Sequence, residues 1–106
     1  MTEIMTNCHK VKHCKCIYNG KLYDTETAKI IGKLSNRIIF KTNNSNYFLA
    51  EENAGMVTII ENGCYVTRPE IEYFNISPMD ENQLKNYLGQ YDIGEYIRIF
   101  GEPEEA

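Results

Sequence analysis

The chain contains no tryptophan, and nowhere in its 106 positions do eighteen apolar residues follow one another. A membrane-spanning helix needs about twenty such residues, so the sequence predicts no membrane span. The first ten residues lack the apolar run of a secretory signal, and we therefore expect a cytoplasmic protein. A basic excess is also missing: the net charge is -4 and the isoelectric point is about 5.1, which argues against a dedicated nucleic-acid binder.

The motifs of common enzymes are missing as well. The sequence has no glycine-rich phosphate loop, no helix with paired acids and no metal-hydrolase spacing, and neither His9 nor His13 stands beside a serine or cysteine nucleophile elbow. Cys64 directly follows Asn62-Gly63, where a cysteine flanking a turn is the simpler interpretation than a reactive thiol. We therefore expect no catalytic residues and no enzyme.

The length of the chain limits its organisation. With 42% apolar residues, 106 positions fit one domain over residues 1–106, with the ends at 1–10 and 102–106 expected to be flexible. A domain of this size has a small margin of stability, so a homodimer or a bound metal would help it.

Charge is unevenly distributed along the chain. Residues 1–41 hold eight Lys and Arg against three acids, which gives 8 - 3 = +5, whereas residues 42–106 hold three against twelve, which gives 3 - 12 = -9. If the two halves form different faces, their field can steer a partner. If they interleave in space, the charges cancel.

Local patterns predict three β-hairpins. The first and third are centred on Asn19-Gly20 and Asn62-Gly63, because a type I′ turn needs two residues that accept positive φ. The second is "RIIFKTNNSNYFLAEE", in which a polar cluster separates two apolar runs. For the first hairpin, counting outward from the turn pairs Tyr18 with Lys21 and Cys16 with Tyr23.

Three helices are expected. The spacing of Ala28, Ile31 and Leu34 predicts one over residues 25–34, after the first hairpin. Ser77-Pro78 suggests the start of a second, which carries Leu84, Tyr87, Leu88 and Tyr91 on one face, and Asp92 with Glu95 suggests the start of a short third. The predicted fold class is therefore α+β, with an antiparallel sheet of three hairpins, one helix after the first hairpin and two short C-terminal helices.

Three stretches carry a resemblance: "NGKLYDTETAKIIG" at 19–32, "NYFLAEE" at 46–52 and "SPMDENQLKNYLGQYDIGEYIRIFGE" at 77–102. Together they resemble a group of short accessory proteins of phages and other mobile elements in Firmicutes. The motifs mark turns and helix caps rather than chemistry. The resemblance implies an accessory protein that binds and modulates host machinery, with inhibition of bacterial defence, of the anti-CRISPR type, among the roles.

The stretch "CHKVKHCKC" at residues 8–16 is rich in groups that bind zinc. Zinc takes four nitrogen or sulfur ligands at defined spacings, and the candidates here are Cys8, His13, Cys14 and Cys16. The spacing matches no standard site, because the histidines are four apart and Cys14 and Cys16 are two apart, which suits different elements. We expect no metal and no cofactor, with zinc as the alternative.

The same stretch permits a nucleic-acid alternative, because Lys10, Lys12, Lys15 and Tyr18 form a basic, aromatic hairpin edge. Our leading hypothesis is instead protein recognition, since the chain holds eight tyrosines and four phenylalanines and tyrosine suits interfaces. The partner expected is a host protein that belongs to a nucleic-acid-handling complex, with a basic groove that meets the acidic C-terminal half. The candidate contacts are Asp80, Glu81, Tyr87, Tyr91, Glu95 and Glu102.

Overall fold

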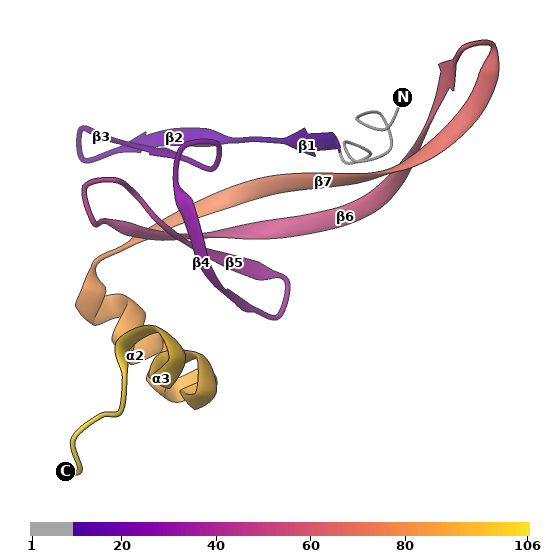
Figure 1. The fold of residues 1–106 in the computed structure, drawn as a ribbon. Coiled ribbons are helices and arrows are strands. Elements are labelled where there is room, and N and C mark those ends of the chain that lie inside the picture. Colours follow the sequence, from indigo (N-terminus) through magenta and orange to yellow (C-terminus); the bar gives the residue numbers. More distant parts are fainter. Residues whose placement is uncertain (1–9) are drawn as a thin grey trace.

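The structure is a computed structural model, and it describes residues 10–106. In this part of the chain, seven strands are followed by two helices (Figure 1). Their bounds are β1 (Lys10–Lys12), β2 (Lys15–Tyr18), β3 (Lys21–Asp24), β4 (Lys29–Leu34), β5 (Arg37–Lys41), β6 (Tyr47–Glu61), β7 (Cys64–Met79), α2 (Glu81–Tyr91) and α3 (Ile93–Phe100).

Five of the strands form one sheet in the order β1-β7-β6-β5-β4, and β2 and β3 form a separate hairpin. All neighbours in the large sheet are antiparallel except β1, which runs parallel to β7 and pairs Val11 with Ile71. The β2–β3 hairpin covers one face of the sheet and the two helices cover the other (Figure 1). The body of the molecule thus has three layers.

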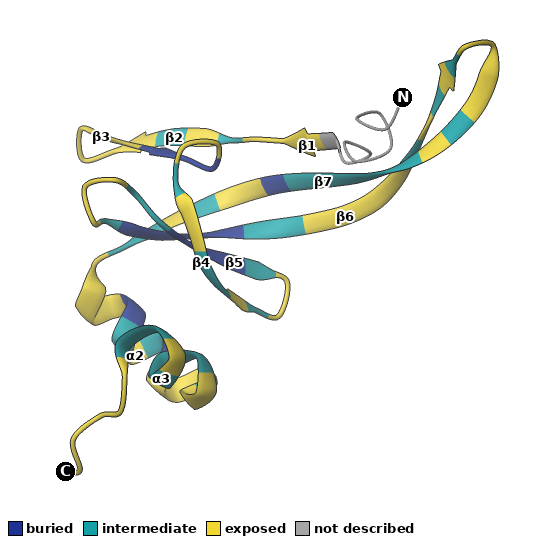
Figure 2. Cartoon of the chain, viewed as in Figure 1, coloured by how far each residue is buried: buried dark blue, intermediate teal, exposed yellow. Residues whose placement is uncertain are grey.

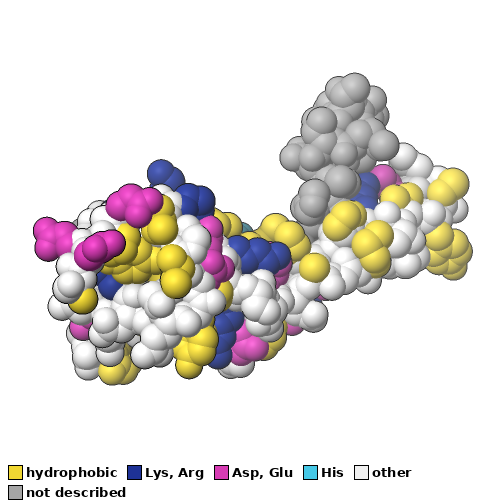
Figure 3. Space-filling view, turned by 90° about the horizontal axis from the view of Figure 1, so that it is seen from below, with side chains coloured by type: hydrophobic (Ala, Val, Ile, Leu, Met, Phe, Trp, Pro, Cys, Tyr) yellow, Lys and Arg dark blue, Asp and Glu magenta, His cyan; other side chains and the backbone are white. Residues whose placement is uncertain are grey.

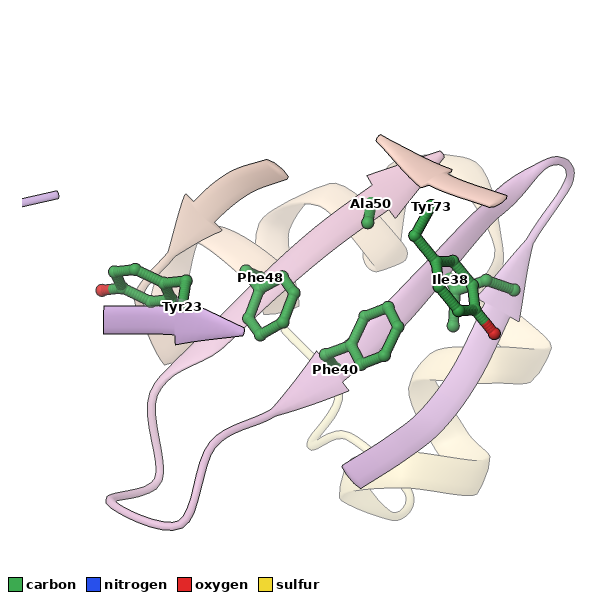
Figure 4. Close-up of a cluster of buried hydrophobic side chains, with 6 residues drawn as sticks. All are labelled: Tyr23, Ile38, Phe40, Phe48, Ala50 and Tyr73. Carbon is green, nitrogen blue, oxygen red and sulfur yellow. The ribbon is translucent and has the colours of Figure 1, made fainter. Parts of the chain in front are cut away.

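The central strands β5 and β6 are apolar on both faces because both faces are covered. Successive side chains of a strand point to opposite faces, so a continuous apolar run fits a strand buried on both sides. Phe40 and Phe48 form a cross-strand pair whose rings stack at 4.7 Å, and Tyr23 from the hairpin meets Phe48 edge-on (Figure 4). Such aromatic pairs contribute about 0.5–1.5 kcal/mol each beyond the area they bury.

The opposite face of the same strands receives the helices. Ile39 and Leu49 are buried there against Leu84 and Leu88 of α2. Leu84 and Leu88 are one helical turn apart, which is the spacing that the sequence predicted for the inward face of this helix. The apolar face predicted for this helix therefore packs on the sheet through Leu84 and Leu88.

The Asn-Gly turns are confirmed. Asn19, Gly20, Asn62 and Gly63 all have positive φ, between 52° and 78°, as a type I′ turn requires. The predicted register of the first hairpin is also correct, since Tyr18 pairs with Lys21 and Cys16 with Tyr23. The second and third hairpins exist too, and they share the long strand β6 in one sheet. The prediction that all three hairpins form one sheet is wrong, because β2 and β3 pair only with each other and pack on the face of the larger sheet.

The helix predicted over residues 25–34 is wrong, because residues 29–34 form strand β4. Asp24 begins only a single turn: its carboxylate accepts from the Glu26 N–H at 2.9 Å, and the Ala28 N–H donates to the Asp24 carbonyl. Two β-branched isoleucines favour a strand here, and Gly32 disfavours a helix. A tight turn at Ser35, with φ of 58°, returns the chain to pair with β5.

The predicted start of the second helix is also wrong. Ser77 and Pro78 still belong to β7, where they pair with Leu49 and Phe48. The N-cap is Asp80, whose side chain accepts from the Gln83 N–H while the Gln83 side chain accepts from the Asp80 N–H. This reciprocal capping box satisfies the backbone N–H groups of Asp80 and Gln83. A proline in the first turn provides no such hydrogen bonds, so the helix starts at Asp80. Asp92 caps α3 as predicted, by accepting from the Glu95 N–H.

The fold class α+β is confirmed in its coarse form: a mostly antiparallel sheet with two short C-terminal helices. The tail at residues 102–106 has no helix or strand and is exposed. Of the N-terminal stretch that we expect to be flexible, residues 1–9 lie outside the described residues, and Lys10 begins β1. No helix in the described part of the chain is long and apolar enough to cross a membrane.

Candidate protein-interaction surfaces

The most unusual feature of the molecule is the far part of the β6–β7 hairpin, residues 53–69, which we call the arm. It projects from the three-layered body, and the whole molecule is 63 Å long but only 21 Å thick (Figure 1). Beyond Glu51 strand β6 has lost its partner β5, and β1 pairs only with residues 70–72 of β7. The arm is therefore a two-stranded ribbon, and none of its residues is buried (Figure 2).

Local interactions explain why the arm forms a regular ribbon. The turn at Asn62-Gly63 fixes the register, and Ile59 pairs with Val66 across the strands. The hydroxyls of Thr58 and Thr67 lie 3.4 Å apart. On the other face of the ribbon, Arg68 donates to the Glu61 carboxylate.

One face of the arm is strongly apolar and open to solvent. Met56, Ile60 and Tyr65 share this face, and their exposed fractions are 65%, 68% and 80%. Figure 3 shows hydrophobic side chains spaced along the arm. A two-stranded ribbon cannot cover its own faces, so these apolar side chains stay exposed.

The arm is also electrically neutral. Glu61 and Arg68 are its only charged residues, and they pair with each other. Acidic side chains gather instead at the other end of the molecule, over the helices and the C-terminal tail (Figure 3). The two ends therefore differ in chemistry, with an apolar neutral arm at one and an acidic surface at the other.

Two of the six predicted partner contacts have structural roles. Asp80 and Glu95 serve the fold: Asp80 caps α2, and the Glu95 carboxylate accepts from the Lys33 N–H at 3.1 Å and from Arg98 Nε at 2.7 Å. The Arg98 guanidinium is the main reason that the pKa of Glu95 lies below its usual value. Arg98 also donates to the Ile31 carbonyl, so this pair ties α3 to β4.

Glu81, Glu102 and Tyr91 remain accessible. Glu81 is exposed and pairs with Lys85 one helical turn away, and Glu102 lies in the exposed tail. The exposed ring of Tyr91 lies 5.0 Å from that of Tyr87, whose hydroxyl accepts from Arg37. These residues are the part of the predicted set that can still meet a partner.

The basic N-terminal edge lies among acids rather than apart from them. Lys12 is 3.8 Å from Glu72, because β1 pairs with the acidic part of β7, and Lys15 stands directly opposite Asp24. Lys33 similarly reaches Glu52 of β6. The two charged halves of the sequence therefore interleave at several places. Of the nucleic-acid candidates, Lys12, Lys15 and Tyr18 are exposed, and Lys10 is described only as the first residue of β1.

The Cys and His residues take part in packing where the structure describes them. Cys14 and Cys16 are half-buried beside the core under the β2–β3 hairpin. His13 Nδ1 lies 3.3 Å from the Thr25 hydroxyl, which also accepts from the Cys14 N–H. Burial raises the pKa of the Cys14 thiol, with a smaller effect from the charges of Cys16 and Asp24.

A raised pKa disfavours the thiolate that zinc requires. Within residues 10–106, no group of three His, Cys, Asp or Glu side chains is placed to hold a metal ion. Cys8, the remaining candidate of the zinc alternative, lies outside the described residues, as does His9.

The sequence analysis did not predict the arm, although the sequence carries a signal for it. The alternating segments on either side of Asn62-Gly63 were correctly read as a hairpin. Their length was not used: β6 and β7 have 15 and 16 residues, far more than β5 with 5, so most of the hairpin extends past its neighbour.

Comparisons with models of known protein families, with curated proteins and with solved structures gave no match to this chain. The case for a function therefore depends on the surfaces described above.

Proposed function

We propose that this chain is a non-enzymatic accessory protein that binds a host protein and modulates or inhibits it, and that the arm makes the main contact. The observation that carries the proposal is the exposure of Met56, Ile60 and Tyr65 on one face of a ribbon that projects from the body. Binding energy in protein interfaces is concentrated in a few large side chains that become buried, and aromatic residues and Met are enriched among interface residues.

The chemistry of the arm favours a protein over a nucleic acid as the partner. Nucleic-acid binding depends on cations that replace the counterions of the phosphates. The only cation of the arm, Arg68, already pairs with Glu61. An apolar, neutral ribbon instead suits the apolar surface of a folded protein.

The resemblance to mobile-element accessory proteins supports a host target, and it suggests a nucleic-acid-handling complex such as a CRISPR-type nuclease. The acidic end of the molecule supplies a second contact of the right sign for a basic groove, through Glu81, Glu102 and Tyr91. Inhibition would then follow from occlusion of the groove, which requires no chemistry from the accessory protein.

The test compares two exposed apolar pairs in the same chain. Ile60 pairs with Tyr65 beside one Asn-Gly turn, and Ile17 pairs with Leu22 beside the other. The wild-type protein is used to capture its partner from a bacterial lysate, and binding of that purified partner is measured by calorimetry. We expect Ile60→Ser with Tyr65→Ser to weaken binding by about 100-fold, because each anchor residue contributes roughly 1–2 kcal/mol.

The matched control, Ile17→Ser with Leu22→Ser, should bind as the wild type does. Unchanged binding by the Ile60/Tyr65 variant would refute the arm as the main contact. Charge reversal at Glu81 and Glu102, or at Lys12 and Lys15, then shows which other surface is used. Loss of binding only in the lysine variant, with a steep dependence on salt, would favour the nucleic-acid alternative.

A further inference from the structure

Strand β6 has a free edge along the arm. β5 pairs with β6 only as far as Glu51, and the Glu52 N–H donates to the Asn36 carbonyl at 2.7 Å in the turn that precedes β5. In the described chain, no strand lies beside residues 53–61 on that side. A free strand edge is a template for pairing with another strand.

Two contacts show which N–H and C=O groups of β6 face the open edge. The Glu52 N–H points to the β5 side, and backbone groups alternate along a strand, so Ala54, Met56, Thr58 and Ile60 also point outward. The residues between them bond to β7, as Glu61 does with Cys64 beside the turn. Four N–H groups and four C=O groups therefore face the open edge.

The two edges of the arm are not equivalent. On β7, the backbone groups of Arg68 and Glu70 point toward their partners Val57 and Gly55 of β6. Pro69 lies between them, so its backbone position faces the open edge of β7. Proline lacks an N–H and blocks the addition of a strand. Residues 53–61 of β6 contain no proline and no lysine, and their only charge is Glu61 at the end. The β6 edge thus lacks the usual protections of a free edge.

The segment 53–61 is complementary to itself when it is reversed about Val57. Ala54 then faces Ile60 of a second strand, Gly55 faces Ile59, and Met56 faces Thr58, so in each of these pairs a larger side chain meets a smaller one, and Val57 faces its own copy. Glu61 faces the neutral amide of Asn53, and no like charges meet. The residues whose backbone groups face the open edge in one copy lie opposite the same kind of residue in the other copy. Every free N–H and C=O group of the edge can therefore form an interstrand hydrogen bond.

We propose that two copies of this chain pair through residues 53–61 of β6, antiparallel and centred on Val57. The two arms join into a four-stranded ribbon with the two bodies at opposite ends, so the net charges of -4 stay apart. A two-stranded ribbon is marginally stable in water, and additional strands remedy this. The interface is isologous, as two-fold symmetry requires.

This pairing goes beyond the proposed function and does not depend on it. Edge pairing leaves the faces of the ribbon open, so Met56, Ile60 and Tyr65 of both copies would lie on one wider apolar surface. A host protein can bind that surface whether or not the edges pair, and the two proposals can therefore fail separately.

The first test uses a disulfide at the two-fold axis. At Val57 the paired residues are a non-hydrogen-bonded antiparallel pair, whose Cα atoms lie about 4.5 Å apart, within the range for a disulfide. In a background with Cys8 and Cys64 replaced by Ser, Val57→Cys should give a covalent dimer on a non-reducing gel after mild oxidation. Ile59→Cys is the matched control on the same face, and it should form no covalent cross-link because its counterpart in the second copy is Gly55. Cross-linking of Ile59→Cys but not Val57→Cys would overturn the proposed register.

The second test uses proline at two facing positions. Thr58 and Thr67 form a cross-strand pair, and both have N–H groups that point away from the ribbon. Thr58→Pro blocks the β6 edge and Thr67→Pro blocks the β7 edge, at a similar cost to the ribbon itself. In light scattering, wild type and Thr67→Pro should be dimers and Thr58→Pro a monomer. A monomeric wild type, or a dimer lost only in Thr67→Pro, would refute pairing through β6.

Discussion

At the residue scale, Glu95 shows how one side chain can look like a binding residue and be structural. The Arg98 guanidinium lowers the pKa of the Glu95 carboxyl, while partial burial raises it by less and the Lys33 N–H lowers it further. A carboxyl group with a lowered pKa in the folded state stabilises the fold above its unfolded pKa, which is roughly 4.3 for Glu. That stabilisation is lost as the pH falls through the lowered folded value.

We therefore expect Glu95→Gln to be less stable than the wild type at pH 7 and to approach it as the pH falls below about 4. Urea unfolding at a series of pH values measures this difference. Glu81→Gln is the control, because the Glu81–Lys85 pair is exposed and such pairs contribute little. A difference between Glu95→Gln and wild type that did not change with pH would show that the Arg98 contact has no electrostatic part.

At the scale of elements, the sequence predicted the Asn-Gly turns and the Asp92 cap correctly, but it misplaced the start of the second helix and predicted a helix where strand β4 forms. Asn-Gly turns and the Asp92 cap depend on residues next to each other in the chain, so local patterns suffice. Whether residues 29–34 form a helix or a strand depends on β5, which lies beside them and offers its edge. The apolar spacing of Ala28, Ile31 and Leu34 was compatible with either, and tertiary pairing decided.

Gly32 allows another element to pack closely against this edge strand. A Cβ at this position would lie 2.6 Å from Glu95 Oε2, 2.8 Å from Arg98 Nη2 and 3.1 Å from Ile99 Cδ1. The absence of a side chain lets α3 dock closely against β4. The close approach of another element cannot be read from local sequence.

We expect Gly32→Ala to destabilise the fold by about 1–3 kcal/mol, because the added methyl group displaces side chains that are held by hydrogen bonds. Gly89→Ala is the opposite control. Gly89 lies in α2 with no atom within 4 Å of a Cβ, so this change should stabilise the fold by roughly 0.5–1 kcal/mol. Thermal unfolding of both variants tests the pair. An unchanged melting temperature for Gly32→Ala would mean that α3 can shift away from β4 without loss of stability.

At the scale of the whole molecule, the candidate site was the least predictable part. The predicted acidic contacts were chosen by charge, and two of them turned out to hold the helices in place. The arm could not be recognised because alternating residues predict a strand without saying which of its faces are covered. Whether a face of β6 is covered depends on how far the neighbouring strands extend. Strand β5 ends beside Glu51, so the part of β6 that follows has no neighbour on that side.

The separation of arm and body leads to the last prediction. The buried residues of the described chain all lie outside residues 53–69, from Tyr23 to Ala50 and at Tyr73, Leu84 and Leu88. Deleting residues 56–61 and 64–69 joins Gly55 to Asn62 and Gly63 to Glu70. Gly55 and Glu70 are a hydrogen-bonded cross-strand pair, as Glu61 and Cys64 are. The Asn-Gly turn can therefore follow them in the same register.

The shortened protein should unfold cooperatively with a melting temperature close to that of the wild type, because no core contact is removed and Glu61 and Arg68 leave together as a pair. It should also be monomeric and should no longer bind the host protein. Calorimetry and light scattering on the same sample give the two readouts. A large drop in melting temperature would show that the arm stabilises the body, whereas a stable variant that still dimerises or binds would move the interaction surface back to the three-layered body.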